Sequence, residues 1–205
     1  MNKETATPAM ICDRLYHLAK AVIVILERHN IPYSMAFGTL LGAVRHQGFI
    51  PWDEDFDLWL FDDTYDEAIE YLRAELPEDM FLEDAKSEPN YFHSWAHVKD
   101  VNSLAPHSRY QHDDSYEHKG LYIDLYKLTR MKESELWDFL NSENRKYIMR
   151  RKDLGLISDE EYNTRMQKLA ENEKEHAVYD GDTDEEIYSL ISPYKCKQLR
   201  SEERL

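Results

Sequence analysis

The sequence contains little cysteine, glycine or proline, and each shortage excludes a class of protein. Its 205 residues include 2 cysteines, Cys12 and Cys196, which lie near opposite ends of the chain and form no C-x-x-C motif. Such sparse cysteine excludes a disulfide-built fold and is typical of the reducing cytosol. The 6 glycines and 7 prolines are too few for a low-complexity or loop-built chain.

Basic residues and long apolar runs are also scarce. Lys and Arg number 25 against 41 Asp and Glu, which gives a formal net charge of −16. A chain this acidic lacks the basic field that nucleic acids or polybasic membrane contacts require. The apolar stretch Ala19–Leu26 is shorter than the ~20 residues that span a bilayer, and the N-terminus shows no signal-peptide pattern. We therefore expect a soluble cytoplasmic protein that neither binds nucleic acid nor inserts into a membrane.

Enough apolar residues remain to build a core. Hydrophobic residues make up 42% and aromatic residues 12% of the chain, which excludes general disorder. Strand-like and helix-like segments alternate before residue 130, whereas only helical patterns follow. This order predicts an α+β fold with a mixed sheet and flanking helices in a core of residues 1–130. Residues 131–205 are predicted to form a helical extension that packs on this core.

Hydrophobic periodicity and the positions of Gly and Pro predict the individual elements. Thr7 and Pro8 suit the start of a helix, because Pro is well tolerated in the first helical turn. The predicted helices cover residues 9–29, 40–45, 63–76, 133–152, 158–177 and 183–191, and Gly155 is predicted to end the helix 133–152. The predicted strands cover residues 33–37, 55–61, 80–83, 92–99 and 121–128, and residues 100–119 are predicted to form a polar loop.

Two acidic residues are candidates for a metal site. Asp55 and Asp57 are two positions apart in the predicted strand 55–61, so both carboxylates are expected on one strand face. Carboxylates side by side repel each other unless a cation lies between them, and oxygen ligands of this kind suit Mg²⁺ together with substrate phosphates. Taken alone, the pair is better explained as the solvated end of an acidic strand.

The neighbouring sequence favours the metal interpretation. Gly38 and Thr39 join a predicted strand to a predicted helix, where a phosphate can approach backbone N–H groups at the helix N-terminus. Asp124 stands between Ile123 and Leu125 in an apolar strand, where an acid is costly to bury unless it is paired or metal-bound. A strand, a small turn, a helix, a D-x-D strand and then a lone strand Asp follow the order found in nucleotidyltransferase-fold enzymes.

A long run around these residues resembles the signature of the LicD family. The run AFGTLLGAVRHQGFIPWDEDFDLWL, residues 36–60, is similar to the usual family pattern GTLLGxxRHxGxIPWDDDxD. HVKDVNSLA at 97–105 resembles the lysine-containing strand of the family, and HKGLYIDLYKL at 118–128 resembles its G-x-x-I-D-I-F-P-L segment. There are two departures: Glu54 replaces the usual Asp, and residues 126–129 replace Phe-Pro-Leu-Asp after the third acid.

The resemblance implies a nucleotidyltransferase-like fold and a role for each matched residue. Asp55 and Asp57 would hold Mg²⁺ (or Mn²⁺), and Asp124 would complete the metal site or act as a base toward the acceptor hydroxyl. The residues that would bind the donor phosphates are Gly38, Thr39, Arg45, His46 and Lys99. Arg45 could equally pair with Asp53 or Glu54, and Lys99 could be an ordinary lysine at a strand end.

The resemblance also implies a reaction. A hydroxyl of a cell-surface glycan precursor, such as lipopolysaccharide or teichoic acid, would attack a phosphorus of a CDP-alcohol such as CDP-choline, and CMP would leave. Two alternatives use the same scaffold: nucleotidyl transfer from an NTP, and a catalytically silent protein that binds a glycan or another partner. The three aspartates argue against the silent protein, and the acidic chain favours a CDP-alcohol over the more highly charged NTP.

Residues 91–122 are rich in histidine and in aromatic residues. The histidines are His93, His97, His107, His112 and His118, and the aromatic residues that could enclose a quaternary ammonium are Tyr91, Phe92, Trp95, Tyr110, Tyr116 and Tyr122. No C-x-x-C or H-E-x-x-H motif accompanies the histidines, so we expect a polar loop rather than a zinc site. For the aromatic residues we expect core packing and surface positions rather than a ligand cage.

Overall fold

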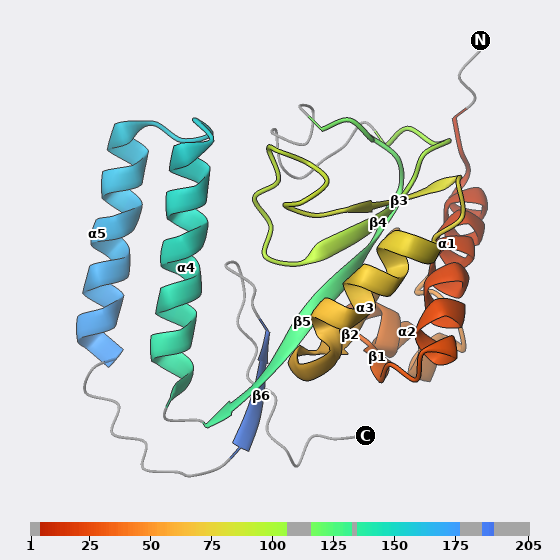
Figure 1. The fold of residues 1–205 in the computed structure, drawn as a ribbon, viewed down its shortest axis with the longest axis horizontal. Helices are drawn as coiled ribbons and strands as arrows, with labels where there is room; N and C mark the ends of the chain where they lie inside the picture. Colours follow the sequence, from red (N-terminus) through yellow and green to blue (C-terminus); the bar gives the residue numbers. More distant parts are fainter. Residues whose placement is uncertain (1–4, 106–115, 133–134, 177–185, 191–205) are drawn as a thin grey trace. The chain divides into compact units, whose positions relative to one another are not determined.

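The computed structural model describes residues 5–105, 116–132, 135–176 and 186–190 of the chain, and Figure 1 shows how their elements follow one another. The helices are α1 (Pro8–Arg28), α2 (Phe37–His46), α3 (Asp62–Glu75), α4 (Leu136–Asp153) and α5 (Asp159–His176). The strands are β1 (Tyr33–Met35), β2 (Asp57–Phe61), β3 (Met80–Glu83), β4 (Ala96–Asp100), β5 (Tyr122–Lys132) and β6 (Glu186–Leu190). This mixture of helices with one sheet confirms the predicted α+β fold.

The strands form one sheet in the order β1-β2-β5-β4-β3, and β6 pairs with β5 off this path. The pairs β1 with β2, β3 with β4, and β4 with β5 are antiparallel. Strands β2 and β5 are neighbours in the sheet although they are far apart in the chain. The sheet therefore brings the D-x-D segment at the start of β2 next to the strand that carries Asp124.

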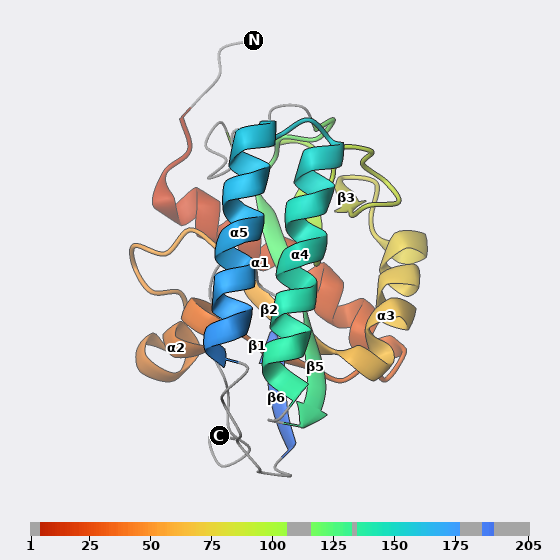
Figure 2. The same cartoon turned by 90° about the vertical axis from the view of Figure 1, so that its left-hand side faces the viewer.

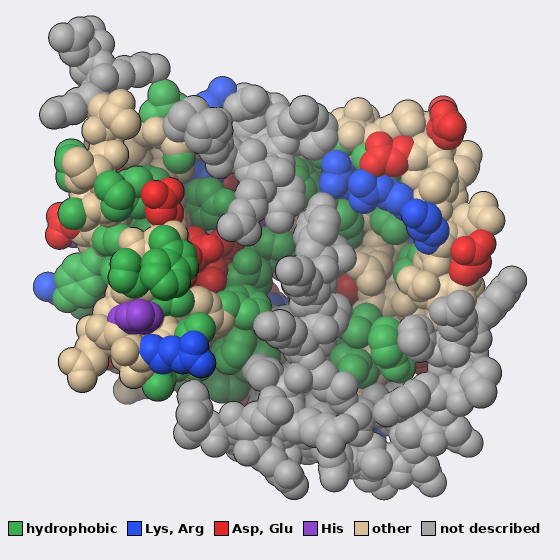
Figure 3. Space-filling model, turned by 180° about the vertical axis from the view of Figure 1, so that it is seen from behind, with side chains coloured by type: hydrophobic (Ala, Val, Ile, Leu, Met, Phe, Trp, Pro, Cys, Tyr) green, Lys and Arg blue, Asp and Glu red, His purple; other side chains and the backbone are tan. Residues whose placement is uncertain are grey.

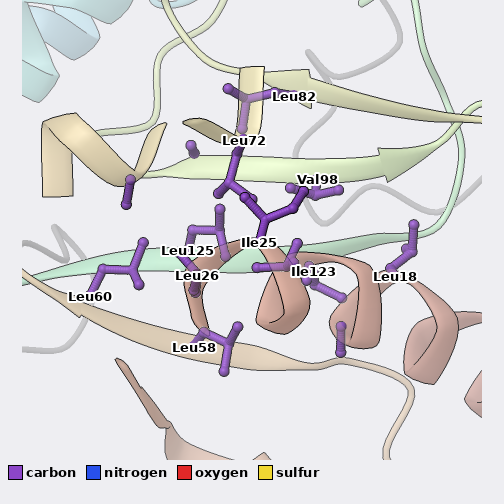
Figure 4. Close-up of a cluster of buried hydrophobic side chains, with 14 of the residues drawn as sticks. Leu18, Ile25, Leu26, Leu58, Leu60, Leu72, Leu82, Val98, Ile123 and Leu125 are labelled. Atoms are coloured by element: carbon purple, nitrogen blue, oxygen red, sulfur yellow. The ribbon is translucent and has the colours of Figure 1, made fainter. Parts of the chain in front are cut away.

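Helices α1 and α3 share a hydrophobic core with one face of this sheet. Figure 4 shows central side chains of this core: Leu18, Ile25 and Leu26 of α1, Leu72 of α3, and Leu58, Leu60, Leu82, Val98, Ile123 and Leu125 of the strands. Burial of a side chain of this size contributes about 1.5–3 kcal/mol to stability. Because side chains alternate along a strand, the residues between these core positions point to the opposite face of the sheet.

Helix α1 begins where the sequence predicts it. Thr7 Oγ1 accepts a hydrogen bond from the backbone N–H of Met10 at 3.3 Å, and proline occupies the first helical turn. Further along α1, the guanidinium of Arg14 lies 2.8 Å from Asp79 Oδ2 and 2.7 Å from Asp100 Oδ1. Ion pairs as well as apolar packing therefore join α1 to the segment before β3 and to the end of β4.

The chain divides into two compact units. The first consists of Met1–Tyr91 and Trp95–Lys127, and the second of Phe92–Ser94 and Leu128–Leu205. The predicted boundary after residue 130, and the packing of the extension on the core, stay predictions. Across the described ranges, no helix combines the length and the apolar character needed to cross a membrane.

In the second unit, α4 and α5 lie side by side (Figure 1, Figure 2). Gly155 follows the end of α4 with a φ of 70°, a left-handed conformation that glycine adopts without strain. The N–H of Gly155 donates to the carbonyl of Lys152, and the N–H of Leu156 donates to that of Arg151, both at 2.9 Å. These two bonds satisfy carbonyls at the helix end and confirm the predicted role of Gly155.

The helix predicted at 183–191 is wrong for residues 186–190, which form β6. β6 is antiparallel to the end of β5, with Leu190 opposite Leu128 and Glu186 opposite Lys132. The physical reason is that β5 continues beyond the predicted end at residue 128 and offers backbone N–H and C=O groups that need partners. Residues 183–185 and 191 lie outside the described residues.

Several other boundaries differ from the predicted ones, and three of them concern elements near the candidate site. Helix α2 begins at Phe37 rather than at residue 40, β2 begins at Asp57 rather than at residue 55, and β4 begins at Ala96 rather than at residue 92. The later start of β2 leaves Asp55 before the strand. Strand alternation therefore fixes the direction of Asp57 but not that of Asp55.

Candidate active site

The sheet face opposite the core carries charged side chains in the first unit. Ala96 and Val98 of β4 belong to the hydrophobic core, so His97 between them points the other way. The strand register places Glu83 of β3 and Asp124 of β5 directly opposite His97, one on each side. Three neighbouring strands thus align Glu83, His97 and Asp124 across the sheet.

These charged groups pair with one another. His97 Nδ1 lies 3.1 Å from Glu83 Oε2, and His97 Nε2 lies 3.0 Å from Asp124 Oδ1. Lys99 Nζ lies 2.8 Å from Glu83 Oε1 and donates to the backbone carbonyl of His118 at 2.9 Å. Glu83 is 0%, His97 2% and Lys99 3% exposed. Charges buried this deeply are tolerated only when close partners of opposite sign offset the loss of hydration.

The pKa of His97 makes its ring a cation at neutral pH. Burial by itself lowers the pKa of His97, but the nearby carboxylates of Asp124 and Glu83 outweigh this and raise the pKa to about 9. Both ring nitrogens therefore carry protons and donate, one to each carboxylate. Charge alternates along Lys99, Glu83, His97 and Asp124, and we call these four residues the charged row.

Asp124 also receives a donor from an aromatic side chain. Trp95 Nε1 donates to Asp124 Oδ1 at 2.6 Å. Trp95 is itself held by the hydroxyl of Tyr91, which donates to the Trp95 carbonyl at 2.6 Å, and by the ring of Tyr126, with ring centroids 4.9 Å apart. Both side-chain contacts of Asp124 use Oδ1, and no donor from the described residues reaches Oδ2. Asp124 is thus a buried acid with partners, as its apolar neighbours in the sequence require.

Asp57 lies beside Asp124 on the neighbouring strand. The backbone N–H of Asp124 donates to the carbonyl of Phe56 at 3.0 Å, so β5 meets the start of β2 at this point. Leu58 belongs to the core, and Asp57 therefore points to the same sheet face as Asp124. The sheet brings together two of the three predicted metal ligands, whereas the half-buried Asp55 lies outside β2.

The donor groups at this point suit a hard cation. Within the described part of the chain, no group of three or more His, Cys, Asp or Glu side chains is arranged to hold a metal ion. Asp57 and Asp124 nevertheless offer carboxylate oxygens, and Mg²⁺ is usually bound by one or two carboxylates together with water and substrate phosphates. The residues therefore fit Mg²⁺ bound jointly with a phosphate, and the magnesium site stays a prediction.

The start of α2 is tied to β2 through Thr39. The N–H of Asp57 donates to Thr39 Oγ1 at 2.9 Å, and the N–H of Ala36 donates to the Asp57 carbonyl at 3.0 Å. No side chain caps α2, and a Cβ on Gly38 would lie 2.5 Å from Asp53 Oδ2. The glycine thus allows a carboxylate to approach a helix N-terminus, where backbone N–H groups favour anions. Phosphate binding by Gly38 and Thr39 stays a prediction.

Arg45 and His46 lie at the other end of α2. Both are exposed in its last turn, roughly 10 Å along the helix from Gly38 at 1.5 Å per residue. In the described ranges Arg45 forms no ion pair with Asp53 or Glu54, so this alternative is not seen. The structure does not bring Arg45 and His46 to the N-terminus of α2, and their role as phosphate ligands stays a prediction.

The aromatic residues near β4 contact one another and Lys99. Tyr91 and Tyr116 are buried, with ring centroids 5.8 Å apart. Lys99 Nζ lies 5.1 Å from the ring centroid of Tyr116 and 5.7 Å from that of Tyr122. The cation that these rings hold is therefore the ammonium of Lys99. Phosphate binding by Lys99 stays a prediction, and Tyr110 lies outside the described residues.

The predicted histidine-rich loop does not form one structural feature. His97 belongs to the charged row, and His118 contacts an aromatic ring of β3. His93 belongs to the second unit, and His107 and His112 lie outside the described residues. The expectation that these histidines do not bind zinc stays a prediction.

Hydrophobic side chains are exposed on α2 and on the loop after it. Phe37, Leu41 and Val44 recur at helical spacing on α2, and Trp52 in the following loop is 80% exposed. Figure 3 shows hydrophobic and acidic side chains next to each other on the face seen from behind. Because Phe37 is the first residue of α2, the start of this helix carries an exposed apolar side chain.

Sequence reasoning missed the part that Glu83, His97 and Trp95 play around Asp124. The alternation of Ala96, His97 and Val98 is the signal that could have placed His97 on the sheet face opposite the core. Its partners could not be read from the sequence, because they depend on the register of three strands that are separated by long connections.

Comparison with known protein families identifies the family of this chain. The family model "LicD/FKTN/FKRP, nucleotidyltransferase domain" matches residues 30–168, which is more than half of the chain. The chain belongs to the LicD family. The matched residues include α2, β2 and the whole charged row, so the resemblance seen in the sequence extends to the strands that surround Asp124.

Individual relatives match over shorter segments. The lipopolysaccharide cholinephosphotransferase LicD of Haemophilus influenzae is 42% identical over 62 residues, which cover 30% of this chain and 23% of that protein. The human ribitol 5-phosphate transferase FKRP is 39% identical over 59 residues, covering 29% of this chain and 12% of that protein. An uncharacterised Rickettsia prowazekii protein is 54% identical over 44 residues, which cover 22% of this chain and 16% of that protein. The chain thus matches less than a quarter of the length of each of these relatives.

Proposed function

We propose that this chain is a metal-dependent transferase that moves a phospho-alcohol group, such as phosphocholine, from a CDP-alcohol to a hydroxyl of a cell-surface glycan precursor. Family membership supports transferase chemistry, and two relatives are named for transfer of choline phosphate and of ribitol 5-phosphate. The observation that carries the proposal is the position of Asp57 and Asp124 on one face of neighbouring strands, next to a helix start that Thr39 ties to Asp57.

In the proposed reaction, the acceptor hydroxyl oxygen attacks the phosphorus that bears the alcohol. The bond between this phosphorus and the oxygen of CMP breaks, CMP leaves, and the hydroxyl proton passes to water. Mg²⁺ held by Asp57 and Asp124, with Asp55 as a further ligand, would neutralise charge on the phosphates. The backbone at Gly38 and Thr39 would orient the donor phosphates, since phosphoryl transfer depends mainly on positioning and charge stabilisation.

Ligand protection against thermal unfolding tests this proposal. The protein is heated with CDP-choline, CDP-ribitol, CDP-glycerol or each of the four NTPs, in Mg²⁺ and separately in EDTA. A ligand at 100 times its Kd adds about 2.7 kcal/mol to stability, which such a measurement detects. We expect a CDP-alcohol to protect only with Mg²⁺. Protection by an NTP alone would favour nucleotidyl transfer, and no Mg²⁺-dependent protection by any ligand would favour the silent protein.

Two charge-removing variants identify the residues involved. Asp55→Asn and Asp57→Asn should each abolish Mg²⁺-dependent protection and turnover. Without ligand, each variant should be as stable as the wild type or slightly more so, because one of several neighbouring negative charges is removed. Asp66→Asn is the matched control, since Asp66 is exposed on α3 and its substitution changes the net charge equally. A drop in stability in Asp55→Asn or Asp57→Asn, or retained turnover when both are combined, would contradict the metal site.

A further inference from the structure

Two donors converge on a single oxygen of Asp124. Trp95 Nε1 lies 2.6 Å and His97 Nε2 3.0 Å from Asp124 Oδ1, and no donor from the described residues reaches Oδ2. A carboxylate that is held by two donors through one oxygen has its plane and its second oxygen fixed in direction. The contacts around Asp124 therefore determine where Oδ2 points.

The ring of His97 is itself held by several neighbours. Its Nδ1 lies 3.1 Å from Glu83 Oε2, and its ring stacks on Tyr122 with centroids 4.6 Å apart. The ring of Tyr91 contacts it edge-on with centroids 5.5 Å apart. Glu83 is held in turn by the ammonium of Lys99 at 2.8 Å. Every ring nitrogen and one ring face of His97 thus have a defined neighbour, which leaves the imidazole little freedom to turn.

Such an arrangement is an inefficient way to stabilise a sheet. Replacing buried ion pairs by apolar side chains of similar volume is often neutral or stabilising, so stability alone does not explain four buried charges in a row. The charged row lies on the face opposite the hydrophobic core, and it ends at Asp124, beside Asp57. Its position thus connects it to the proposed site rather than to the core.

We propose that His97 is a positioning residue for Asp124. Together with Trp95 it binds Asp124 Oδ1, so that Oδ2 is presented to the cation and phosphates of the substrate. Glu83 and Lys99 in turn fix His97. The catalytic part of this inference rests on the proposed function. The structural part, in which His97 Nε2 orients the Asp124 carboxylate, does not depend on it. Metal ligands elsewhere are commonly oriented by a second set of hydrogen-bonding residues in this way.

Two substitutions distinguish the contact that His97 Nδ1 makes with Glu83 from the contact that Nε2 makes with Asp124. The amide nitrogen of Asn is as many bonds from Cα as His Nδ1, and that of Gln is as many bonds as His Nε2. His97→Asn can therefore still donate to Glu83 but not to Asp124, whereas His97→Gln can donate to Asp124 but not to Glu83. Each variant loses one of two buried contacts, so a merely structural His97 would make both equally impaired.

Turnover and a spectroscopic signal are measured on both variants. We expect His97→Asn to lower kcat about 10- to 100-fold relative to His97→Gln, with the donor KM within threefold, as is typical when a ligand loses its orienting partner. The ¹H–¹⁵N resonance of the Trp95 indole, assigned with Trp95→Phe, should shift in His97→Asn and stay near its wild-type position in His97→Gln. His29→Asn and His29→Gln are the controls, because His29 Nε2 lies 2.6 Å from Glu75 Oε1 in a pair outside the site.

The possible results of these measurements either support or overturn the positioning role of His97. Equal kcat values in the two variants, or a lower value in His97→Gln, would overturn it. If the wild type turns over none of the CDP-alcohols, the proposed function fails, and the indole resonance still tests whether His97 orients Asp124. A shift in His97→Asn only would support that orientation, and equal shifts in both variants or in neither would overturn it. If His97→Asn fails to fold while His97→Gln folds, the variant Glu83→Gln is measured in place of His97→Asn. An unchanged kcat and an unchanged Trp95 indole resonance in Glu83→Gln would overturn the role of Glu83 in fixing His97.

Discussion

Raising the pH should remove the stability that the His97 imidazolium contributes to the folded protein. The pKa of His97 is about 9 in the folded protein against 6.5 for an ordinary histidine. A group whose pKa is raised by folding binds its proton more tightly in the folded state and stabilises the fold while it is protonated. The contribution of His97 is therefore complete below pH 6.5 and is lost as the pH rises through 9.

The size of this effect follows from the two pKa values. The difference between 6.5 and about 9 corresponds to about 3 kcal/mol, because one pH unit is worth 1.36 kcal/mol. This is a large share of the about 5–15 kcal/mol that separates folded from unfolded domains. Other groups titrate in the same range, and burial and the nearby Glu54 raise the pKa of the Cys12 thiol. The wild type must therefore be compared with a variant that lacks the imidazole.

Urea unfolding at intervals between pH 6 and pH 10, in EDTA, measures the effect. His97→Gln is the comparison, since glutamine cannot titrate and keeps the donor that faces Asp124. We expect the free energy of unfolding of the wild type to fall by about 3 kcal/mol more than that of His97→Gln over this range. Parallel pH dependence of the two proteins, within about 1 kcal/mol, would show that the carboxylates do not hold a proton on His97.

The remaining predictions concern single substitutions. Arg14→Leu should lower the free energy of unfolding by about 3 kcal/mol, because it leaves the buried carboxylate of Asp100 without its cation. Arg28→Leu should lower it by at most about 1 kcal/mol, because Arg28 forms an exposed ion pair, and urea unfolding compares the two variants. Gly120→Ala should prevent normal folding, seen as lost near-ultraviolet circular dichroism, because a Cβ would overlap the backbone carbonyl of Asp100. Gly38→Ala should fold but lose donor protection in the thermal assay, because a Cβ would lie 2.5 Å from a carboxylate oxygen at the helix start; retained protection would remove Gly38 from the site.

Elements that depend on nearby residues could be predicted from the sequence. The start of α1 follows from Thr7 and Pro8, and the end of α4 follows from Gly155, because a cap involves only residues within one or two turns. β6 could not be predicted in this way. Residues 186–190 form a strand because they pair with the end of β5, and that partner lies more than fifty residues earlier in the chain.

The residues of the site also differ in how far they could be predicted from the sequence. The resemblance to the family predicts Asp57 and Asp124 in one metal site, and the structure places both on one face of adjoining strands. The pairing of Asp124 with His97, and of His97 with Glu83, depends on the register of three strands, which a single sequence does not specify. The sequence predicts His97 within the strand 92–99, but it does not predict that the His97 side chain is buried between two carboxylate partners.

The identity of the released nucleotide tests the proposed function most directly. The protein is incubated with Mg²⁺, a glycan extract and the CDP-alcohol that protects it from unfolding, and the nucleotides are then separated by chromatography. The account predicts CMP in the same amount as phospho-alcohol bound to the glycan, and no pyrophosphate from any of the four NTPs. Pyrophosphate release together with a nucleotide attached to the acceptor would contradict the account and would establish nucleotidyl transfer in its place.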